Sequence, residues 1–182
     1  MYATPSRARS AAVCAATLCA VGAMALPAVA APSPSSAGVS PLDRQLLTAA
    51  HQGNLWEITT GQQARSGATT ACVKRVGADL VRDHRTLDAG VTRTAARLGV
   101  TLPSGQTAAQ LRQTAALKSL SGKAAYDAAW LKAQYPGHVQ TLALIDKEIA
   151  SGTNPTVKSL AKSARPVVAR HIRMVDHGVC HA

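Results

Sequence analysis

Four stretches of the chain place apolar residues three and four positions apart, which is the spacing of one face of an α-helix. The stretches cover about residues 42–65, 69–98, 122–150 and 155–178, and each ends at or near a glycine. Helices with one apolar face are stable when they bury those faces against one another. The pattern therefore predicts an all-α fold, a four-helix bundle over residues 42–178.

A long connection separates the second predicted helix from the third. Within this connection, residues 108–120 carry a helical pattern of their own. That pattern predicts a short helix with Leu111, Ala115 and Leu117 facing inward. The connection is long enough to run the length of the bundle, so the second and third helices need not be antiparallel.

Polar residues stand on the predicted apolar face of all four helices. His84, His138 and His171 lie on the second, third and fourth, and Asn54 and Glu57 lie on the first. A buried polar side chain costs free energy unless it is paired. With a rise of about 1.5 Å per residue, all of these positions fall near mid-helix. In one bundle they would converge at its centre, where helical bundles hold metals and cofactors.

Three interpretations of this cluster are open. The three imidazoles and the carboxylate of Glu57 could hold one transition-metal ion (zinc, copper or iron). Neutral histidines could instead form a polar core layer, hydrogen bonded to Glu57, Asn54, Tyr135 or backbone carbonyls. In the third interpretation, protonation of the histidines below about pH 6.5 loosens the bundle.

The spacing around the histidines argues against di-iron chemistry. Carboxylate-bridged di-iron bundles use Glu-x-x-His on two helices, because residues three apart point into the same site. Here the residues three before the histidines are Val81, Tyr135 and Val168. The leading interpretation is a non-enzymatic protein that binds a metal ion. The alternative is a metal-dependent redox or hydrolytic enzyme with an open coordination position.

The first thirty residues have the order of a secretory signal peptide. Arg7 and Arg9 precede an apolar run over 11–26, and a small-x-small sequence occupies 28–30. Residues 31–41 are rich in Pro, Ser and Ala, which is typical of a flexible linker. We expect a protein that is secreted or associated with the cell envelope, with no membrane span once the signal is removed.

The charge of the mature chain is strongly basic. Removal of the signal leaves 20 − 2 = 18 Lys and Arg against nine Asp and Glu, a net charge of +9. The excess could serve solubility alone, or could attract anionic polymers of the cell envelope. Basic residues are scattered over all the helices and the chain has no Phe, which argues against nucleic-acid binding. The sequence indicates no oligomeric state.

Two cysteines remain after signal removal, Cys72 and Cys180, the latter in a short tail at 179–182. An even number in an oxidising compartment predicts a disulfide. The competing interpretation is a zinc site that joins both cysteines to His177 and His181. A disulfide requires the start of the second helix and the end of the fourth to share one pole. The long connection must then cross the bundle, and a bundle with one such crossover is ferritin-like.

Several short motifs of the chain resemble those of the DUF4142 family of exported bacterial proteins of unknown function. The resemblance covers about residues 42–178 and implies a ferritin-like bundle and export. One departure lies at Gly137, where family members commonly carry an acidic residue before the histidine. The matching segments are Ala50, Asn54 and Glu57 (A…N…E); Val81-Arg82-Asp83-His84 (V-x-D-H); Leu120-Ser121-Gly122 with Tyr126-Asp127 and Trp130, followed by His138; and Pro166 to His171 (P-x-x-x-x-H).

Overall fold

The computed structural model describes residues 38–176 and Cys180. This part of the chain forms five α-helices and no strand, which confirms the all-α prediction. The predicted signal peptide, residues 31–37 of the predicted linker, and His177 and His181 lie outside the described residues. The helices are α1 (Pro41–Gly67), α2 (Ala71–Arg97), α3 (Ala108–Ser119), α4 (Tyr126–Ser151) and α5 (Pro155–Val175).

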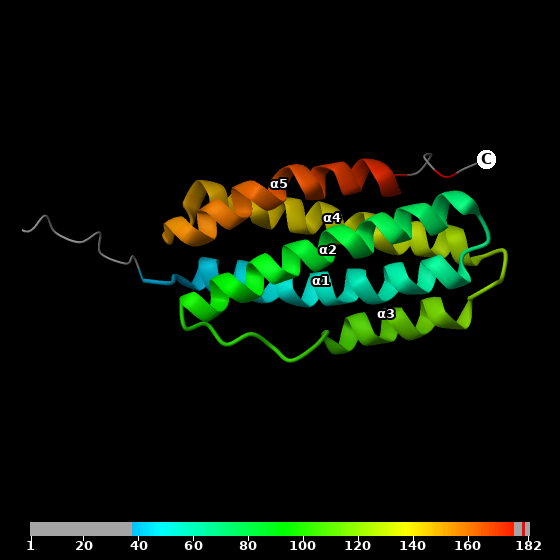
Figure 1. Ribbon diagram of the computed structural model, residues 1–182, viewed down its shortest axis with the longest axis horizontal. Helices are drawn as coiled ribbons and strands as arrows, with labels where there is room; N and C mark the ends of the chain where they lie inside the picture. The colour runs from blue at the N-terminus through cyan, green and yellow to red at the C-terminus, as the bar shows by residue number, and fades with distance from the viewer. Residues whose placement is uncertain (1–37, 177–179, 181–182) are drawn as a thin grey trace, which may run out of the picture. The chain divides into compact units, whose positions relative to one another are not determined.

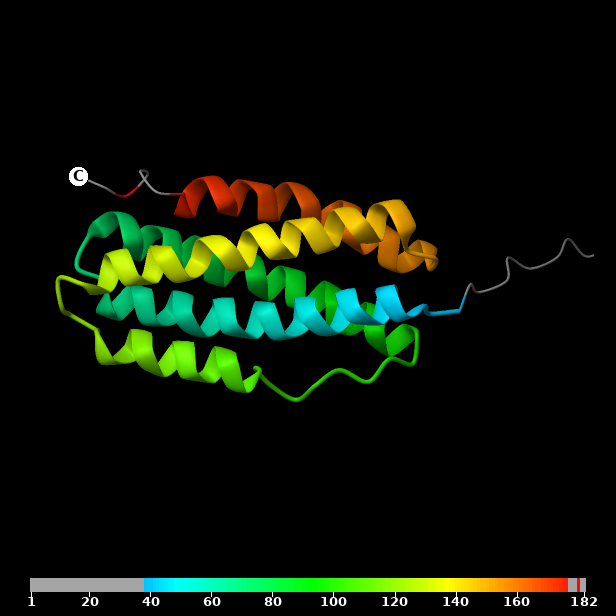
Figure 2. The ribbon, with the colours of Figure 1, turned by 180° about the vertical axis from the view of Figure 1, so that it is seen from behind.

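Four of these helices form the bundle, and α3 lies against its outside. α1 and α2 are antiparallel neighbours, as are α4 and α5, and both views place α3 beside α1 (Figures 1 and 2). The connection from α2 to α4 runs back along the bundle, so that α2 and α4 point the same way (Figure 1). α2 and α5 are therefore antiparallel, as the cysteine positions predict. None of the described helices is long and apolar enough to cross a bilayer.

Side-chain caps explain where the helices begin. Ser40 and Asp43 form a capping box at α1, and Thr107 forms one at α3 with its partner three residues on. Thr70 and Asn154 accept hydrogen bonds from the first free amides of α2 and α5. α2 ends before Gly99, whose φ of +64° suits a glycine after a helix.

Two helix faces differ from those predicted. Leu111 and Ala115 of α3 are exposed, and of the three predicted inward residues Leu117 alone is buried. The reason is that α3 packs onto the outside of α1, so that a single turn reaches the core. On α5 the buried face carries Val168 and Val175, one position on from the predicted Val167 and Met174, which are half-buried.

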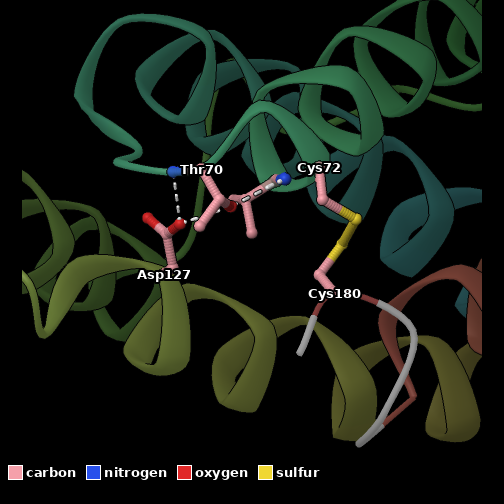
Figure 3. Close-up of a disulfide and its surroundings, with 5 residues drawn as sticks. Thr70, Cys72, Asp127 and Cys180 are labelled. Carbon is pink, nitrogen blue, oxygen red and sulfur yellow. Dashed lines mark hydrogen bonds between the residues drawn. A yellow bond between two sulfur atoms is a disulfide. The ribbon is translucent and has the colours of Figure 1, made fainter. Parts of the chain in front are cut away.

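A disulfide closes one pole of the bundle. Cys72, at the start of α2, is bonded to Cys180, with their Cα atoms 5.5 Å apart (Figure 3). Beside it the carboxylate of Asp127, at the start of α4, accepts hydrogen bonds from the amides of Thr69 and Thr70 at 2.8 Å and from the Thr70 hydroxyl at 2.6 Å. The start of α2 is thus fixed to both α4 and the chain beyond α5.

Two carboxyl groups meet at the opposite pole. Asp43 of α1 accepts hydrogen bonds from the Thr153 hydroxyl at 3.0 Å and the Asn154 amide at 3.2 Å, which ties α1 to the turn between α4 and α5. Glu148 of α4 is fully buried beside it. Burial and the neighbouring Asp43 raise the pKa of Glu148 to about 7. Glu148 therefore retains its proton well above the usual range of a carboxyl group.

The core is divided into two clusters of different composition. One, near the disulfide, contains the aromatic side chains, and we call it the aromatic half. The other contains only aliphatic side chains, and we call it the aliphatic half. The buried members of the aromatic half are Trp56, Ala64, Ala68, Val73, Val76, Leu80, Leu117, Tyr126, Trp130, Leu131, Val175 and Cys180. Those of the aliphatic half are Leu46, Leu47, Val91, Ala95, Val100, Ile145, Val157, Ala161 and Val168.

Candidate metal centre

Three histidines from three helices meet between the two halves of the core. His84 of α2, His138 of α4 and His171 of α5 are 5, 2 and 0 % exposed. Their ring centroids lie 5.0–5.5 Å apart, and one ring nitrogen of each lies within 4.8 Å of the others. The structure thus brings together the three histidines that the sequence placed on separate helix faces. We call these residues the histidine layer.

Each imidazole is held from outside the layer by an oxygen atom. Nδ1 of His84 lies 2.8 Å from the Asn54 side-chain oxygen, and Nδ1 of His138 lies 3.0 Å from the Gln134 carbonyl. Nε2 of His171 lies 3.0 Å from a carboxylate oxygen of Asp83. These oxygens accept hydrogen bonds, so the facing ring nitrogen in each pair carries the proton. The second nitrogen of each ring then presents a lone pair.

The ring nitrogens that carry no proton lack a suitable hydrogen-bond donor. Nε2 of His84 and Nε2 of His138 lie 3.4 Å apart, and two lone pairs cannot share a hydrogen bond. Nδ1 of His171 has no hydrogen-bond partner among the described residues. A tetrahedral ion with bonds of about 2.0–2.1 Å to nitrogen holds its ligands roughly 3.3–3.4 Å apart. The separation between the His84 and His138 nitrogens matches that geometry.

Burial keeps the imidazoles neutral. It lowers the pKa of His84 well below 6.5, and the neighbouring histidines lower it further. Burial also lowers the pKa of His138, to about 4, against a hydrogen bond to Gln134 that raises it. The pKa of His171 is lowered by burial, with Asp83 acting in the opposite direction. Neutral imidazole is the form that binds metal ions.

Asp83 is a negatively charged partner for His171. Burial disfavours its ionisation, but hydrogen bonds from His171, Arg82 and Arg170 outweigh burial and lower the pKa of Asp83 to about 2. Arg82 and Arg170 donate to it at 2.9 and 2.6 Å. Asp83 follows Arg82 and precedes His84 in the sequence, yet its carboxylate contacts His171 on the neighbouring helix. A carboxylate behind a histidine raises the basicity of a metal ligand and fixes its orientation.

Glu57 lies on the outer side of the layer. One of its oxygens is 3.5 Å from Nδ1 of His138, the nitrogen that points away from His84. The Gln134 amide, with its nitrogen facing Glu57, lies 2.7 and 2.8 Å from the two carboxyl oxygens. Burial raises the pKa of Glu57 well above 4.5. The group of ligand atoms within 4.8 Å consists of the three histidines, and Glu57 as a ligand stays a prediction.

Sequence reasoning missed Gln134 as a partner. It precedes His138 by four residues, which places it one turn away on the same face of α4. That spacing was a readable signal for the side chain, because it places the Gln134 amide on the buried face that carries His138. Its side chain is fully buried between Glu57 and Thr60. Gln134 therefore orders both the histidine and the carboxyl group.

A cavity of about 400 Å³ reaches the histidine layer from the aliphatic half. Asn54, Glu57, His84 and His138 form its polar end. The rest of the wall is mainly apolar and comes from all four bundle helices, with two glutamines of α3 at the rim. The cavity thus ends at two of the three members of the histidine layer, His84 and His138.

Comparisons with known proteins agree with this architecture. No curated protein matches the chain. The crystal structure of a DUF305 fragment from Deinococcus radiodurans is similar, with a TM-score of 0.66 and 14% identity over 76% of this chain and 95% of that chain. At this identity the likeness concerns the fold alone. A family model described as a domain of unknown function, DUF4142, matches residues 28–177. The motif resemblance is thereby confirmed, and the chain belongs to the DUF4142 family.

Proposed function

We propose that this protein binds one transition-metal ion through His84, His138 and His171. The observation that carries the proposal is the convergence of one ring nitrogen from each of three buried histidines within 4.8 Å, with Nδ1 of His171 left without a hydrogen-bond partner among the described residues. A polar core layer would be expected to pair donors with acceptors, because an unpaired buried polar atom costs about 1–3 kcal/mol. A cation shared by the three lone pairs satisfies all of them.

The chemistry of the ligand set favours zinc or copper. Imidazole nitrogen suits zinc, copper, iron and nickel, and three neutral histidines with one free position are typical of zinc and copper sites. Asn54, Gln134 and Asp83 would keep each ring in the tautomer that binds the ion. When bound, such an ion acts as a Lewis acid or a redox centre.

Export is part of the proposal. The disulfide between Cys72 and Cys180 fits an oxidising environment. Together with the signal sequence read from residues 1–30, it supports an extracellular or envelope location. The leading function is thus metal binding outside the cytoplasm, and the basic surface would retain the protein near anionic envelope polymers.

A second candidate function is catalysis at the same ion. The observation that favours it is the cavity, which ends at His84 and His138 and could admit a substrate to an open coordination position. A redox or hydrolytic reaction would both be compatible with such a position. A closed site that exchanges no solvent would contradict this candidate.

The test is metal binding by the mature chain, residues 31–182, titrated with Zn²⁺ and Cu²⁺ and checked by elemental analysis. We expect one ion per chain. His84→Ala and His171→Ala should each weaken binding at least a hundredfold. His51→Ala is the matched control, because His51 pairs with Asp88 at 2.7 Å and lies outside the histidine layer. No stoichiometric binding by the wild type, or equal binding by all variants, would refute the proposal.

A further inference from the structure

The cavity beside the histidine layer is built from small side chains that leave room between α1 and α4. Ala49, Ala50 and Gly53 of α1 lie on its wall together with Ala133 and Gly137 of α4. A Cβ atom added at Gly53 or Gly137 would meet nothing within 4 Å. The space is therefore a property of the residue sizes on these two helices.

The wall beyond the histidine layer is apolar. Leu46, Leu87, Leu144 and Leu160 line it, and the last three are only half-buried. Large aliphatic side chains facing a cavity inside a bundle lose the contacts that close packing would give them. An apolar occupant of this space would restore those contacts and remove their surface from water.

The length of the apolar part can be read from the helices. Leu46 lies eight residues before Asn54 on α1, and Ile145 lies seven after His138 on α4. At 1.5 Å per residue these intervals are about 10–12 Å. An extended alkyl chain advances roughly 1.25 Å per carbon, given carbon–carbon bonds of about 1.52 Å. The apolar part thus matches a chain of about eight to ten carbons.

The polar end selects the head group. The cavity lining contains no Lys or Arg, and Glu57 is its single acidic residue. Both oxygens of Glu57 face the Gln134 amide. An ion on three neutral imidazoles would keep most of its charge, because the Asp83 carboxylate behind the histidine layer is already paired with Arg82 and Arg170, and an unpaired charge in a poorly solvated site is costly. A negatively charged oxygen ligand at the remaining position would offset that charge.

We propose that the cavity binds a medium-chain monocarboxylic acid, with the carboxylate directed to the ion at the histidine layer and the alkyl chain in the aliphatic half. The inference rests on the proposed metal binding and names the class of molecule that shares the site. The positive net charge of the chain favours the approach of such an anion. The size of the cavity is in the range of ordinary small-molecule sites.

The experiment titrates octanoate, hexanoate and acetate into the mature chain, with and without Zn²⁺, by calorimetry. Octanoate should bind the zinc-loaded protein at least tenfold more tightly than the metal-free protein. Hexanoate should bind about tenfold more weakly than octanoate, because two fewer methylenes are buried. Octylamine, with the same chain and a positive head, should not bind the zinc-loaded protein.

Two variants test the location. Gly53→Leu should fill the cavity and weaken octanoate binding at least tenfold, with zinc affinity unchanged. Ala143→Leu adds the same bulk on the exposed side of α4 and should bind octanoate as the wild type does.

The outcomes separate the two proposals. Zinc binding with octanoate no tighter than acetate would overturn the carboxylic-acid site and leave metal binding intact. The carboxylic-acid site is likewise overturned if octanoate binds equally without zinc, or if Gly53→Leu has no effect. Absence of zinc binding would overturn both.

Discussion

The aromatic half and the aliphatic half both contain residues of all four bundle helices, yet they are packed differently. In the aromatic half the backbones of α1 and α2 touch, since a Cβ atom at Gly61 would lie 2.8 Å from the Gly77 carbonyl oxygen. In the aliphatic half a Cβ atom at Gly53 meets open space. Both glycines belong to α1 and are eight residues apart. One glycine permits close contact between helices, and the other preserves a cavity.

The aromatic half fixes the arrangement of the helices, and the aliphatic half can adapt. Tyr126 and Trp130 are fully buried in the aromatic half, and the indole of Trp130 donates a hydrogen bond to the Thr60 carbonyl at 3.1 Å. A large ring with a polar anchor, such as that of Trp130, admits few arrangements. Aliphatic and small residues around a cavity can adjust to an occupant. The histidine layer lies where the close-packed region ends.

Acid should have the largest effect on the free energy of unfolding, because it protonates the histidine layer between the two halves. A histidine whose pKa is lowered by folding makes a stabilising contribution above its unfolded pKa of about 6.5, which is lost as the pH falls through the folded pKa. For His138 that window runs from about 6.5 to about 4. The loss from this residue is about 3 kcal/mol. We expect the free energy of unfolding, measured by urea denaturation, to decline over this range.

His138→Gln cannot be protonated in this range, so its free energy of unfolding should fall less steeply with acid. Zn²⁺ should protect the wild type and have little effect on the variant. An identical decline in both proteins between pH 6.5 and 4.5 would contradict the assignment of acid sensitivity to the layer.

Alanine substitutions at the two α1 glycines compare the halves directly. Gly61→Ala introduces a methyl group against the Gly77 carbonyl and the Val81 side chain, and such overpacking costs about 1–3 kcal/mol. Gly53→Ala should instead stabilise the protein by about 0.5–1 kcal/mol, because alanine favours the helix and the methyl group enters open space. Thermal and urea denaturation of both variants measure whether each substitution raises or lowers the free energy of unfolding. The same sign in both would contradict the proposed difference in packing.

The remaining pH effect concerns the pole of the aliphatic half. The pKa of Glu148 is raised to about 7 by burial and by Asp43, so the folded protein holds a proton there that the unfolded chain releases near 4.5. Stability from this group is present below pH 4.5 and is lost as the pH rises through about 7. Glu148→Gln should remove that decline between pH 4.5 and 7. Melting temperatures from pH 5 to 8 test it, and a decline that persists in the variant would contradict it.

The sequence predicted the helices and the meeting of the histidines because both follow from local periodicity. A residue spaced by three and four from buried neighbours must share their face, so His84, His138 and His171 could be placed without knowing the fold. The disulfide then restricted the order of the helices, and the direction of α5 relative to α2 followed. Each of these inferences depends only on the residue pattern of a single helix or on a single covalent bond.

What the sequence did not reveal depends on how helices rotate and pack. The buried face of α5 includes Val168 and Val175 in place of the predicted Val167 and Met174, because apolar residues stand at both positions of each pair and periodicity does not decide which of them faces the core. The pairing of Asp83 with His171, rather than with its neighbour His84, depends on the crossing of α2 and α5. The cavity likewise arises only when the small residues of α1 and α4 are set opposite one another.

The disulfide has a topological consequence for the site. The segment that it closes, from Cys72 to Cys180, contains α2 to α5 and therefore all three histidines. α1, which contributes Asn54, Glu57 and much of the cavity wall, lies outside this covalent ring. A transient separation of α1 would open the cavity while the three imidazoles stayed tethered within one loop. The three candidate ligands thus belong to the covalent ring, and α1, which forms one wall of the cavity, does not.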